Sequence, residues 1–597
     1  MENRFYKKKE YYIDLTKSFK KKHNIISNIR FLMVILIIYF GFKSYESREY
    51  LFYFIEALLV IGFLSLVFYH LKVKEKRFRA ETLLNINEKY MSRSNGKWME
   101  FEDKGEEYID AEHNYSNDLD IVGENSIFQF LNVSNTHTGR KMFSQDLLHP
   151  EKDREIIIER QEAIKELAQE IDLVQEIEYL TLKEKKNLKS PDKLIDYAES
   201  DLNVVENKYA KNIIRFLPIL TIVVNVLGII LKENTLVYAG LGLAILQIGI
   251  WLFGTLKNGS LLSTVAYLKY NLETYIEVLK LIESKEFESA SLIKIKDSMF
   301  SDKSSSIDAI RKLDTITQII NIRSGGAMNL ILNALFLWDY QCIFLLEAWK
   351  EKYGEKVKDW IDGIGQIESL MSFSVLENVL EDTNLPQIVT GKPRVIAEGI
   401  GHPLINKKTR VNNDLKLDDE IFIITGSNMS GKTTFLRTIG VNLVLAYNGA
   451  PVCAEKMECT VLDIMTSMRI QDDLAAGIST FYAEILRIKK IIDKSEEDED
   501  MIFLIDEIFT GTNSPDRISG SINVLANLNK KNIIGAITTH DLELCELDRN
   551  ERIENYHFKD IYKDDNILFD YKIRSGRSTS TNAKNLMRLA GIKIIEE

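Results

Sequence analysis

Two pairs of apolar runs interrupt a chain that is otherwise rich in polar and charged residues. Within each pair a short polar loop, at 43–49 or 232–235, separates the runs, and basic residues flank the outer ends. Apolar runs of this kind are typical of membrane-spanning helices, and an excess of Lys and Arg marks their cytoplasmic ends. The pattern predicts two transmembrane hairpins in the cell membrane, with both ends of each in the cytoplasm. The four runs are Phe31–Phe42, Tyr50–Leu71, Phe216–Leu231 and Leu236–Leu256.

The first run is short for a complete span. We expect its helix to begin earlier, over Ile25–Ile29, with the charged end of Arg30 reaching back to the membrane surface. Buried helical hairpins of a soluble protein are the alternative interpretation. Because two separate pairs carry basic residues on their outer flanks, the membrane interpretation is the stronger one.

Residues 72–212 and 257–390 carry apolar positions at helical spacing, which predicts an all-α core and lever region in two parts. Within the first part, Glu151–Ile177 has the pattern of one long amphipathic helix. Five aromatic residues in the second part are either packing anchors or a surface that stacks nucleic-acid bases, and their helical context favours packing. They are Trp338, Tyr340, Trp349, Tyr353 and Trp360.

A turn at 391–393 ends the helical part, and short apolar runs typical of buried strands follow it. One of these runs starts at Ile421 and breaks into GSNMSGKT, which fits the phosphate-loop pattern G-x-x-x-x-G-K-[ST] between a strand and a helix. The backbone N–H groups of such a loop surround phosphate oxygens, so the pattern predicts nucleotide binding. The predicted nucleotide-binding residues are Gly426, Ser427, Asn428, Met429, Ser430, Gly431, Lys432, Thr433 and Thr434.

Three further positions complete a predicted site for ATP hydrolysis. Lys432 is expected to reach the β and γ phosphates of ATP, and the Thr433 hydroxyl to bind Mg²⁺. The strand pattern that ends at Asp506 is followed by Glu507, which suits metal binding by the first carboxylate and polarisation of the attacking water by the second. The strand pattern Ile533–Thr539 is followed by His540, which is placed to sense the γ-phosphate.

Composition limits the partners and the compartment. Of 597 residues, 45% are hydrophobic and 27% are charged, which is enough for large buried cores. The formal net charge of −12 excludes a surface that is basic all over, so contact with nucleic acid requires a local basic patch. The four cysteines have no metal-ligand spacing and fit a reducing cytoplasm as ordinary core residues.

Taken together, these motifs resemble the MutS family of DNA mismatch-repair ATPases, and more narrowly its membrane-anchored relatives. Upstream segments that resemble the family's helical core and lever are IFQFLN, THTGRK, RQEAIKEL and GHPLI, from about residue 118. The similarity is closest over 400–597, in TGSNMSGKTTFLRTIG, GISTFYAEILRIKKII, IDEIFTGTNSPDR, TTHDLEL and FDYKIRSGRSTSTNAKNLMRLAGI.

The resemblance implies an ABC-type P-loop ATPase that works as a homodimer and opens and closes helical arms around double-stranded DNA. It implies that Asn428, Lys432 and Thr433 hold the triphosphate and Mg²⁺, that Asp506 supports the metal, that Glu507 activates water, and that His540 contacts the γ-phosphate. It also places Tyr571 against adenine and the loop Thr510–Asp516 at the partner's nucleotide. The residues of that loop that would act in trans are Thr512, Asn513 and Ser514.

The chain also departs from the family's pattern. Asn513 stands where the family's trans-acting loop carries serine, and no counterpart of the mismatch-reading domain with its Phe-x-Glu wedge precedes residue 118. The sequence favours a membrane-anchored MutS-like ATPase acting on DNA, with no small-molecule substrate beyond ATP. The alternative is a membrane-bound, ATP-driven protein-interaction or remodelling switch without a DNA role.

The predicted fold is multidomain and combines transmembrane α-helical hairpins, an all-α core and lever, and a C-terminal α/β P-loop ATPase domain. The predicted order is a basic cytoplasmic N-terminus at 1–30, hairpins at 31–71 and 213–256, helical regions at 72–212 and 257–390, and the ATPase domain at 391–597.

Overall fold

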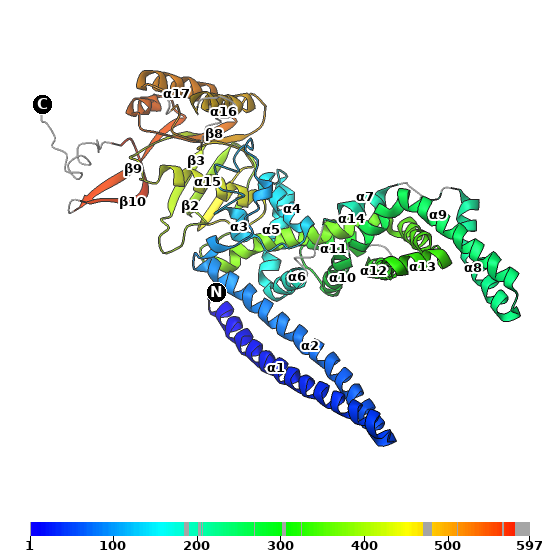
Figure 1. Cartoon of the computed structure of the whole chain (residues 1–597). Helices are drawn as coiled ribbons and strands as arrows, with labels where there is room; N and C mark the ends of the chain where they lie inside the picture. Colours follow the sequence, from blue (N-terminus) through cyan, green and yellow to red (C-terminus); the bar gives the residue numbers. More distant parts are fainter. Residues whose placement is uncertain are drawn as a thin grey trace.

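The computed structural model describes residues 2–183, 190–200, 205, 207–267, 269–300, 306–323, 325–469, 480–509, 512–563 and 566–578. It is elongated, with a C-terminal α/β domain at one end, a helical arm in the middle and two projecting helical hairpins (Figure 1). The chain is therefore largely helical, as predicted, with its strands confined to the last third of the described residues.

The first hairpin consists of α1 (Glu2–Ser47) and α2 (Tyr50–Ser94), which are 46 and 45 residues long. At about 1.5 Å per residue, each is about 70 Å long, more than twice the hydrocarbon thickness of a bilayer. The basic N-terminal residues belong to α1 itself. The Arg30 guanidinium hydrogen-bonds Nδ1 of His70 on the neighbouring helix at 2.7 Å.

The helical arm differs from the predicted pattern at one point. In place of one helix over Glu151–Ile177, the structure has α5 (Arg154–Gln169) and α6 (Ile171–Lys183), separated at Glu170. The break has a packing reason, because α5 contacts α11 and α14 whereas α6 contacts α2 and α10. The other arm helices are α3 (Ile127–Leu131), α4 (His137–Leu148), α7 (Asp192–Glu199), α10 (Lys269–Ser284), α11 (Ala290–Phe300), α12 (Ser306–Asn321), α13 (Gly326–Phe336) and α14 (Trp338–Val379).

The 42-residue helix α14 is the spine of the arm, and most of the aromatic residues predicted as packing anchors lie on its buried side. Tyr340, Trp349, Tyr353 and Trp360 are all less than 10% exposed, which confirms packing and excludes a stacking surface for nucleic acid at these positions. Trp349 also donates its indole N–H to the carbonyl of Ala309 at 2.8 Å. The four cysteines are buried and unpaired, as predicted.

The second hairpin, α8 (Lys208–Leu231) and α9 (Asn234–Tyr267), extends from the far end of the arm. The two helices approach closely where Gly228 faces the turn, because a Cβ there would lie 2.9 Å from the backbone nitrogen of Val237. By length and composition, four of the described helices could cross a membrane, namely α1, α2, α8 and α9. Between 0% and 22% of each apolar stretch is buried within the protein.

The α/β domain contains two sheets. The larger has the strand order β10-β9-β4-β8-β7-β6, in which β4, β6, β7, β8 and β9 run parallel. The smaller has the order β1-β5-β2-β3. The strands are β1 (Gln387–Ile388), β2 (Arg394–Ile400), β3 (Asn413–Asp418), β4 (Ile421–Thr425), β5 (Lys456–Cys459), β6 (Asp463–Ser467), β7 (Met501–Asp506), β8 (Ile533–Thr539), β9 (Ile553–Lys563) and β10 (Asn566–Ser575).

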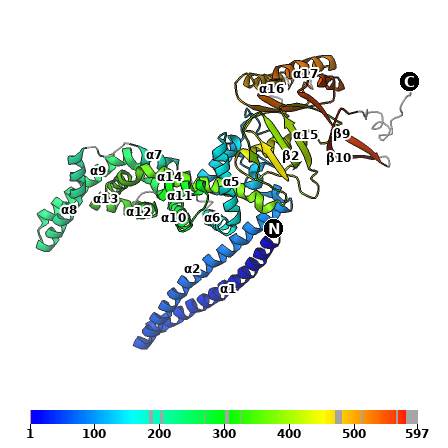
Figure 2. The same cartoon turned by 180° about the vertical axis from the view of Figure 1, so that it is seen from behind.

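Helices cover both faces of the larger sheet. The helix α15 (Lys432–Tyr447) packs with Phe422, Ile424 and Leu504 on one face. The helices α16 (Thr480–Lys494) and α17 (Ser514–Leu528) pack with the alternate side chains on the other face. In Figure 2 these two helices lie at the top of the domain, above α15. Strands buried on both faces read as continuous apolar runs, which is why β4, β7 and β8 could be recognised in the sequence.

Candidate active site

The predicted phosphate loop lies between β4 and α15, at the carboxyl edge of the parallel strands. Gly431 has a φ of +110°, a conformation that side chains rarely adopt. At Gly426, a Cβ would lie 2.8 Å from Ser430 Oγ. The Ser430 hydroxyl is itself buried and makes no hydrogen bond within the described part of the chain. The loop therefore packs closely around the Ser430 hydroxyl, which lacks a hydrogen-bond partner. Such an arrangement suits an anionic ligand.

Lys432 lies at the centre of the site and is almost completely buried. Its ammonium donates to the carbonyl oxygens of Gly426 and Ser427 at 2.8 and 3.1 Å, and lies 3.6 Å from Glu507 Oε1. Burial lowers the pKa of Lys432, and the carboxylates of Glu507 and Asp506 oppose that shift. This cation is therefore held at the mouth of the loop, where a phosphate would meet it.

Asp506 is fixed by two threonines at the end of β7. It accepts a hydrogen bond from the Thr433 hydroxyl at 2.6 Å and another from the Thr538 hydroxyl at 2.5 Å. A hydroxyl oxygen beside a carboxylate oxygen is a donor set that Mg²⁺ prefers, so Thr433 and Asp506 fit the predicted metal site. Sequence reasoning missed Thr538, because a threonine within a buried strand pattern carries no chemical signal of its own.

Glu507 and His540 contact each other directly. The His540 Nε2 atom lies 2.8 Å from Glu507 Oε1 and 2.8 Å from Asn428 Oδ1. Both neighbours are acceptors, so Nε2 carries the ring proton that they share. This hydrogen bond, followed by the charge of Lys432, lowers the pKa of Glu507 despite its partial burial. Glu507 is therefore kept ionised, and its φ of +51° shows that the backbone is strained where the carboxylate is presented.

The remaining nucleotide-binding candidates surround the loop. Met429 is 82% exposed and Thr434 also faces solvent. Ser427 donates its hydroxyl to Asp560 on β9 at 2.7 Å. Tyr571 on β10 lies against the loop, because a Cβ at Gly431 would be 3.2 Å from its ring. The structure thus places the predicted adenine-stacking tyrosine beside the phosphate loop.

The predicted trans-acting residues lie at the start of α17. Asn513 caps this helix by accepting a hydrogen bond from the backbone N–H of Asp516 at 3.1 Å, and both Asn513 and Ser514 are exposed. Thr512 donates its N–H to the carbonyl of Phe509. Thr510 and Gly511 of the same loop, and the parts of the family-like segments at 477–479 and 579–592, lie outside the described residues.

Arg517 is a site residue that the sequence did not reveal. Its guanidinium makes a two-pronged ion pair with Asp541, with both nitrogen–oxygen distances at 2.6 Å. Asp541 directly follows His540, so this pair ties α17 to the segment that carries the predicted sensor. A planar, two-pronged pair fixes the relative orientation of its two side chains. Arg517 therefore has a positioning role for the segment that carries His540.

Two carboxylates join the helical arm to the α/β domain, and we call this contact the latch. Asp120 pairs with Arg437 on α15 at 2.7 Å and with Arg469 after β6 at 2.5 Å. Asp118 accepts the backbone N–H of Arg469 at 2.9 Å. The latch residues are Asp118, Asp120, Arg437 and Arg469. Because Arg437 belongs to α15, which starts at Lys432, one helix connects the phosphate loop to the contact with the arm.

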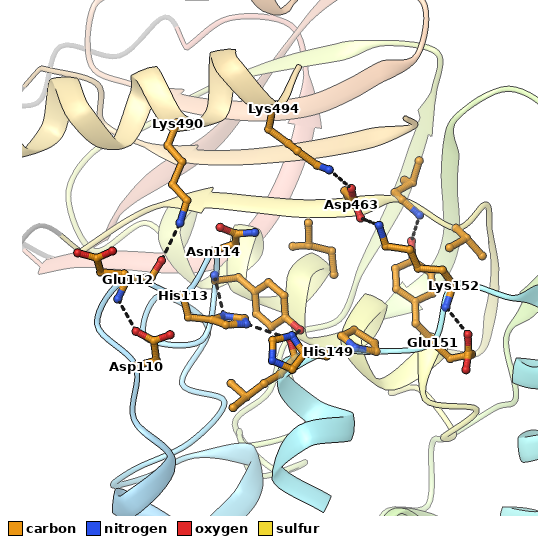
Figure 3. Close-up of a pocket in the computed structure, with 17 residues that line it drawn as sticks. Asp110, Glu112, His113, Asn114, His149, Glu151, Lys152, Asp463, Lys490 and Lys494 are labelled. Carbon is orange, nitrogen blue, oxygen red and sulfur yellow. Dashed lines mark hydrogen bonds and ion pairs between the residues drawn. The ribbon is translucent and has the colours of Figure 1, made fainter. Parts of the chain in front are cut away.

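A cavity of about 430 Å³ lies beside the latch, between residues 110–115, the end of α4, β6 and α16 (Figure 3). Its polar side chains bond mainly to one another and to backbone. Lys152 and Lys494 both pair with Asp463, at 2.6 and 2.9 Å, and Lys490 donates to the carbonyl of Glu112. The cavity contains none of the predicted site residues, so it belongs to the junction between arm and domain.

Comparison with known proteins gives one consistent result. Residues 422–595 match the family MutS domain V. The chain is 34% identical over 239 residues to the DNA mismatch repair protein MutS of Aquifex pyrophilus, which covers 38% of this chain and 27% of that protein. It is 31% identical over 286 residues to the protein of the same name from Lysinibacillus sphaericus, covering 46% and 33%. The ATPase domain of this chain belongs to the MutS family.

The similarity is partial on both sides. A further relative, DNA mismatch repair protein MutS 2 of Halobacterium salinarum, is 31% identical over 247 residues, which cover 40% of this chain and 28% of that protein. This chain thus spans about a third or less of the length of the MutS proteins it matches. The matched domain contains the phosphate loop, Asp506, Glu507, His540 and Tyr571.

The first prediction concerns the two charges at the centre of the MutS-type site. Lys432→Ala should abolish measurable ATP binding, because it removes the buried cation at the loop mouth. Glu507→Gln should retain binding but slow hydrolysis by about 10²- to 10⁴-fold, the usual contribution of a general base. Nucleotide binding is measured by equilibrium dialysis and hydrolysis by phosphate release.

The matched controls are the substitutions Lys531→Ala and Glu546→Gln, at exposed positions outside the site. Both substitutions should leave ATP binding and hydrolysis unchanged. Hydrolysis at the wild-type rate by either site variant would show that the assignment is wrong.

The second prediction concerns the latch. Asp120→Asn should weaken the contacts to Arg437 and Arg469 by about 1.5–3 kcal/mol, the range for hydrogen bonds to charged groups. Hydrogen exchange should then become faster in peptides covering 113–127 and 461–469. Glu124→Gln, which removes only an exposed partner of Lys104, is the control and should not change exchange. Equal exchange in both variants would mean that the latch does not hold the arm.

Proposed function

We propose that this protein is a membrane-anchored ATPase of the MutS type, whose nucleotide cycle moves its helical arm on double-stranded DNA. The observation that carries the proposal is the contact between Lys432, Glu507 and His540 at the carboxyl edge of β4, β7 and β8. Membership of the MutS family supports the same reading.

ATP fits the phosphate loop, with Lys432 and the loop N–H groups against the phosphates and Tyr571 beside the base. Thr433 and Asp506 would hold Mg²⁺, which when bound neutralises charge on the phosphates. Glu507 is kept ionised by His540 and Lys432, so it is ready to accept a proton from water near the loop. The protein's own contribution is thus a positioned base, a buried cation and a fixed pair of oxygen ligands.

His540 suits the role of sensor because its Nε2 atom contacts three groups of the site. Glu507 Oε1 and Asn428 Oδ1 lie 2.8 Å from this nitrogen, and Lys432 Nζ lies 3.4 Å from it. A phosphate oxygen entering this cluster would compete for Lys432 and for the ring proton, so it would change the orientation of the base. Arg517, through Asp541, would pass that change to α17.

A homodimer with composite sites is part of the proposal. Asn513 and Ser514 are exposed at the N-terminus of α17, where helix geometry favours an anion. An exposed helix start beside a nucleotide site is well suited to a second copy's phosphates. The side chain of Asn513 is engaged in capping, whereas the Ser514 hydroxyl accepts a longer hydrogen bond, of 3.4 Å, from Arg517. This difference favours Ser514 as the residue that would reach across.

Membrane anchoring is supported by the placement of the two hairpins. In Figure 1 the tips of α1–α2 and of α8–α9 both point away from the α/β domain, toward the lower right, and Figure 2 shows the same relation from behind. Both tips carry the apolar stretches, whose side chains are largely exposed. One bilayer could receive both hairpins, with the N-terminus and the ATPase domain in the cytoplasm.

A second candidate function is a membrane-bound, ATP-driven switch that binds or remodels a partner without DNA. The net charge of −12 favours this candidate, because DNA binding depends on basic surface. Family membership favours DNA. The two candidates share the ATPase site and the anchors and differ only in what the arm contacts.

The third prediction separates these candidates by a salt titration of duplex DNA binding, using the detergent-solubilised protein with and without ATP. Under the DNA proposal, affinity should fall about 10³-fold or more between about 50 and about 200 mM salt if six or more phosphates are contacted. Lys432→Ala should remove the difference made by ATP but keep the salt dependence. Absence of salt-dependent binding would rule out the DNA role and leave the protein-interaction switch.

A further inference from the structure

The helix α13 presents an unusual surface beside the second hairpin. It contacts α8 and α9 and meets α14 at an angle of 77°. No ionisable residue lies between Gly325 and Trp338. Its large exposed side chains are Met328, Leu330, Ile331, Leu335 and Phe336, which are 37–52% exposed.

The polar groups of α13 point toward the protein. Asn333 is fully buried, accepts the backbone N–H of Asp339 at 3.0 Å and donates to Asn329 Oδ1 at 2.7 Å. A helix on a water-exposed surface has its apolar stripe toward the core and its polar stripe outward. The side-chain arrangement of α13 is the opposite, which is the arrangement expected where the surroundings are apolar.

The bend is held by one buried carboxylate. Asp339, the second residue of α14, pairs with Arg323 at 2.6 Å and accepts the indole N–H of Trp251 at 3.0 Å. These bonds fix the direction of α13 relative to α14 and to α9. The orientation of the apolar surface is therefore built into the fold.

The contact with Trp251 also indicates how deep α13 lies relative to the proposed membrane boundary. Trp251 lies near the end of the apolar stretch Asn234–Gly254 of α9, on the side of the arm. Tryptophan prefers the boundary between hydrocarbon and water. Because Asp339 bonds to Trp251, the end of α13 lies level with the cytoplasmic boundary proposed for α9. Arg215, near the base of α8, is exposed there and could meet lipid phosphates.

We propose that α13 is a third membrane element, a short helix whose apolar side enters the cytoplasmic face of the bilayer beside α8 and α9. The inference rests on the proposed membrane anchoring. With 11 residues, α13 is about 16 Å long and covers about half of the hydrocarbon thickness, so it enters without crossing. The occupant of this surface is the acyl region of lipid, because the surface is continuous with the apolar surfaces of the hairpin. The arm is then attached to the membrane surface as well as to the spans.

The fourth prediction tests this inference by fluorescence quenching in vesicles. The full-length protein carrying Ile331→Cys is labelled with an environment-sensitive fluorophore and reconstituted with lipids that bear a quencher on the acyl chain. The four native cysteines are buried, so labelling is directed to the new site. Matched variants are Ile245→Cys, exposed within the apolar stretch of α9, and Thr315→Cys, exposed on α12. Circular dichroism and gel filtration verify that each variant folds.

The expected result is quenching of the labels at 331 and 245 and none at 315. Quenching at 245 without quenching at 331 would overturn the inference about α13 and leave the anchoring intact. A label at 331 that is shielded from water but not quenched by lipid would mean that a protein surface covers α13, which also overturns the inference. Quenching at neither 331 nor 245 would contradict both this inference and the proposed anchoring.

Discussion

The site depends on the in-register parallel pairing of β4, β8 and β7. Thr425 pairs with Thr539 and Asp506 pairs with Thr538, so the three strands end at the same level. The segments that follow them therefore meet at one edge, although they lie far apart in the sequence. Without this register, Lys432, Glu507 and His540 would be three unrelated polar residues after three apolar runs, and no local interaction would bring them together.

The sequence was sufficient for those parts of the site that have a local signature. The phosphate loop, the Asp506–Glu507 pair and His540 each follow a strand pattern, and the structure brings them into contact. The latch could not be predicted in this way, since Asp120 and Arg437 are ionic partners 317 positions apart and surface charges are common. The ion pair of Arg517 with Asp541 could not be predicted for the same reason. The prediction of one continuous helix was wrong at Glu170, because the apolar periodicity continues there while the packing partners of the helix change.

The latch connects the phosphate loop mechanically to the elongated arm. The helix α15 begins at Lys432 in the phosphate loop and carries Arg437, which binds Asp120 of the arm. Movement of the loop around a nucleotide would thus be transmitted to the arm within a few residues. At its other end the arm carries α8 and α9, and α14 connects the two regions as one long buried helix. Under this proposal, the ATPase site and the α8–α9 hairpin lie at opposite ends of one lever.

The central claim is that this MutS-family domain is held on the cytoplasmic side of a membrane by two hairpins, and labelling of intact cells tests it most directly. Ser47→Cys and Asn234→Cys lie beside the two hairpin turns, at the end of α1 and the start of α9, and Ser519→Cys is exposed on α17. A membrane-impermeant maleimide should react with the first two variants in intact cells and with the third only after the membrane is permeabilised. Labelling of Ser519→Cys from outside, or protection of both turns until the membrane is opened, would contradict the account.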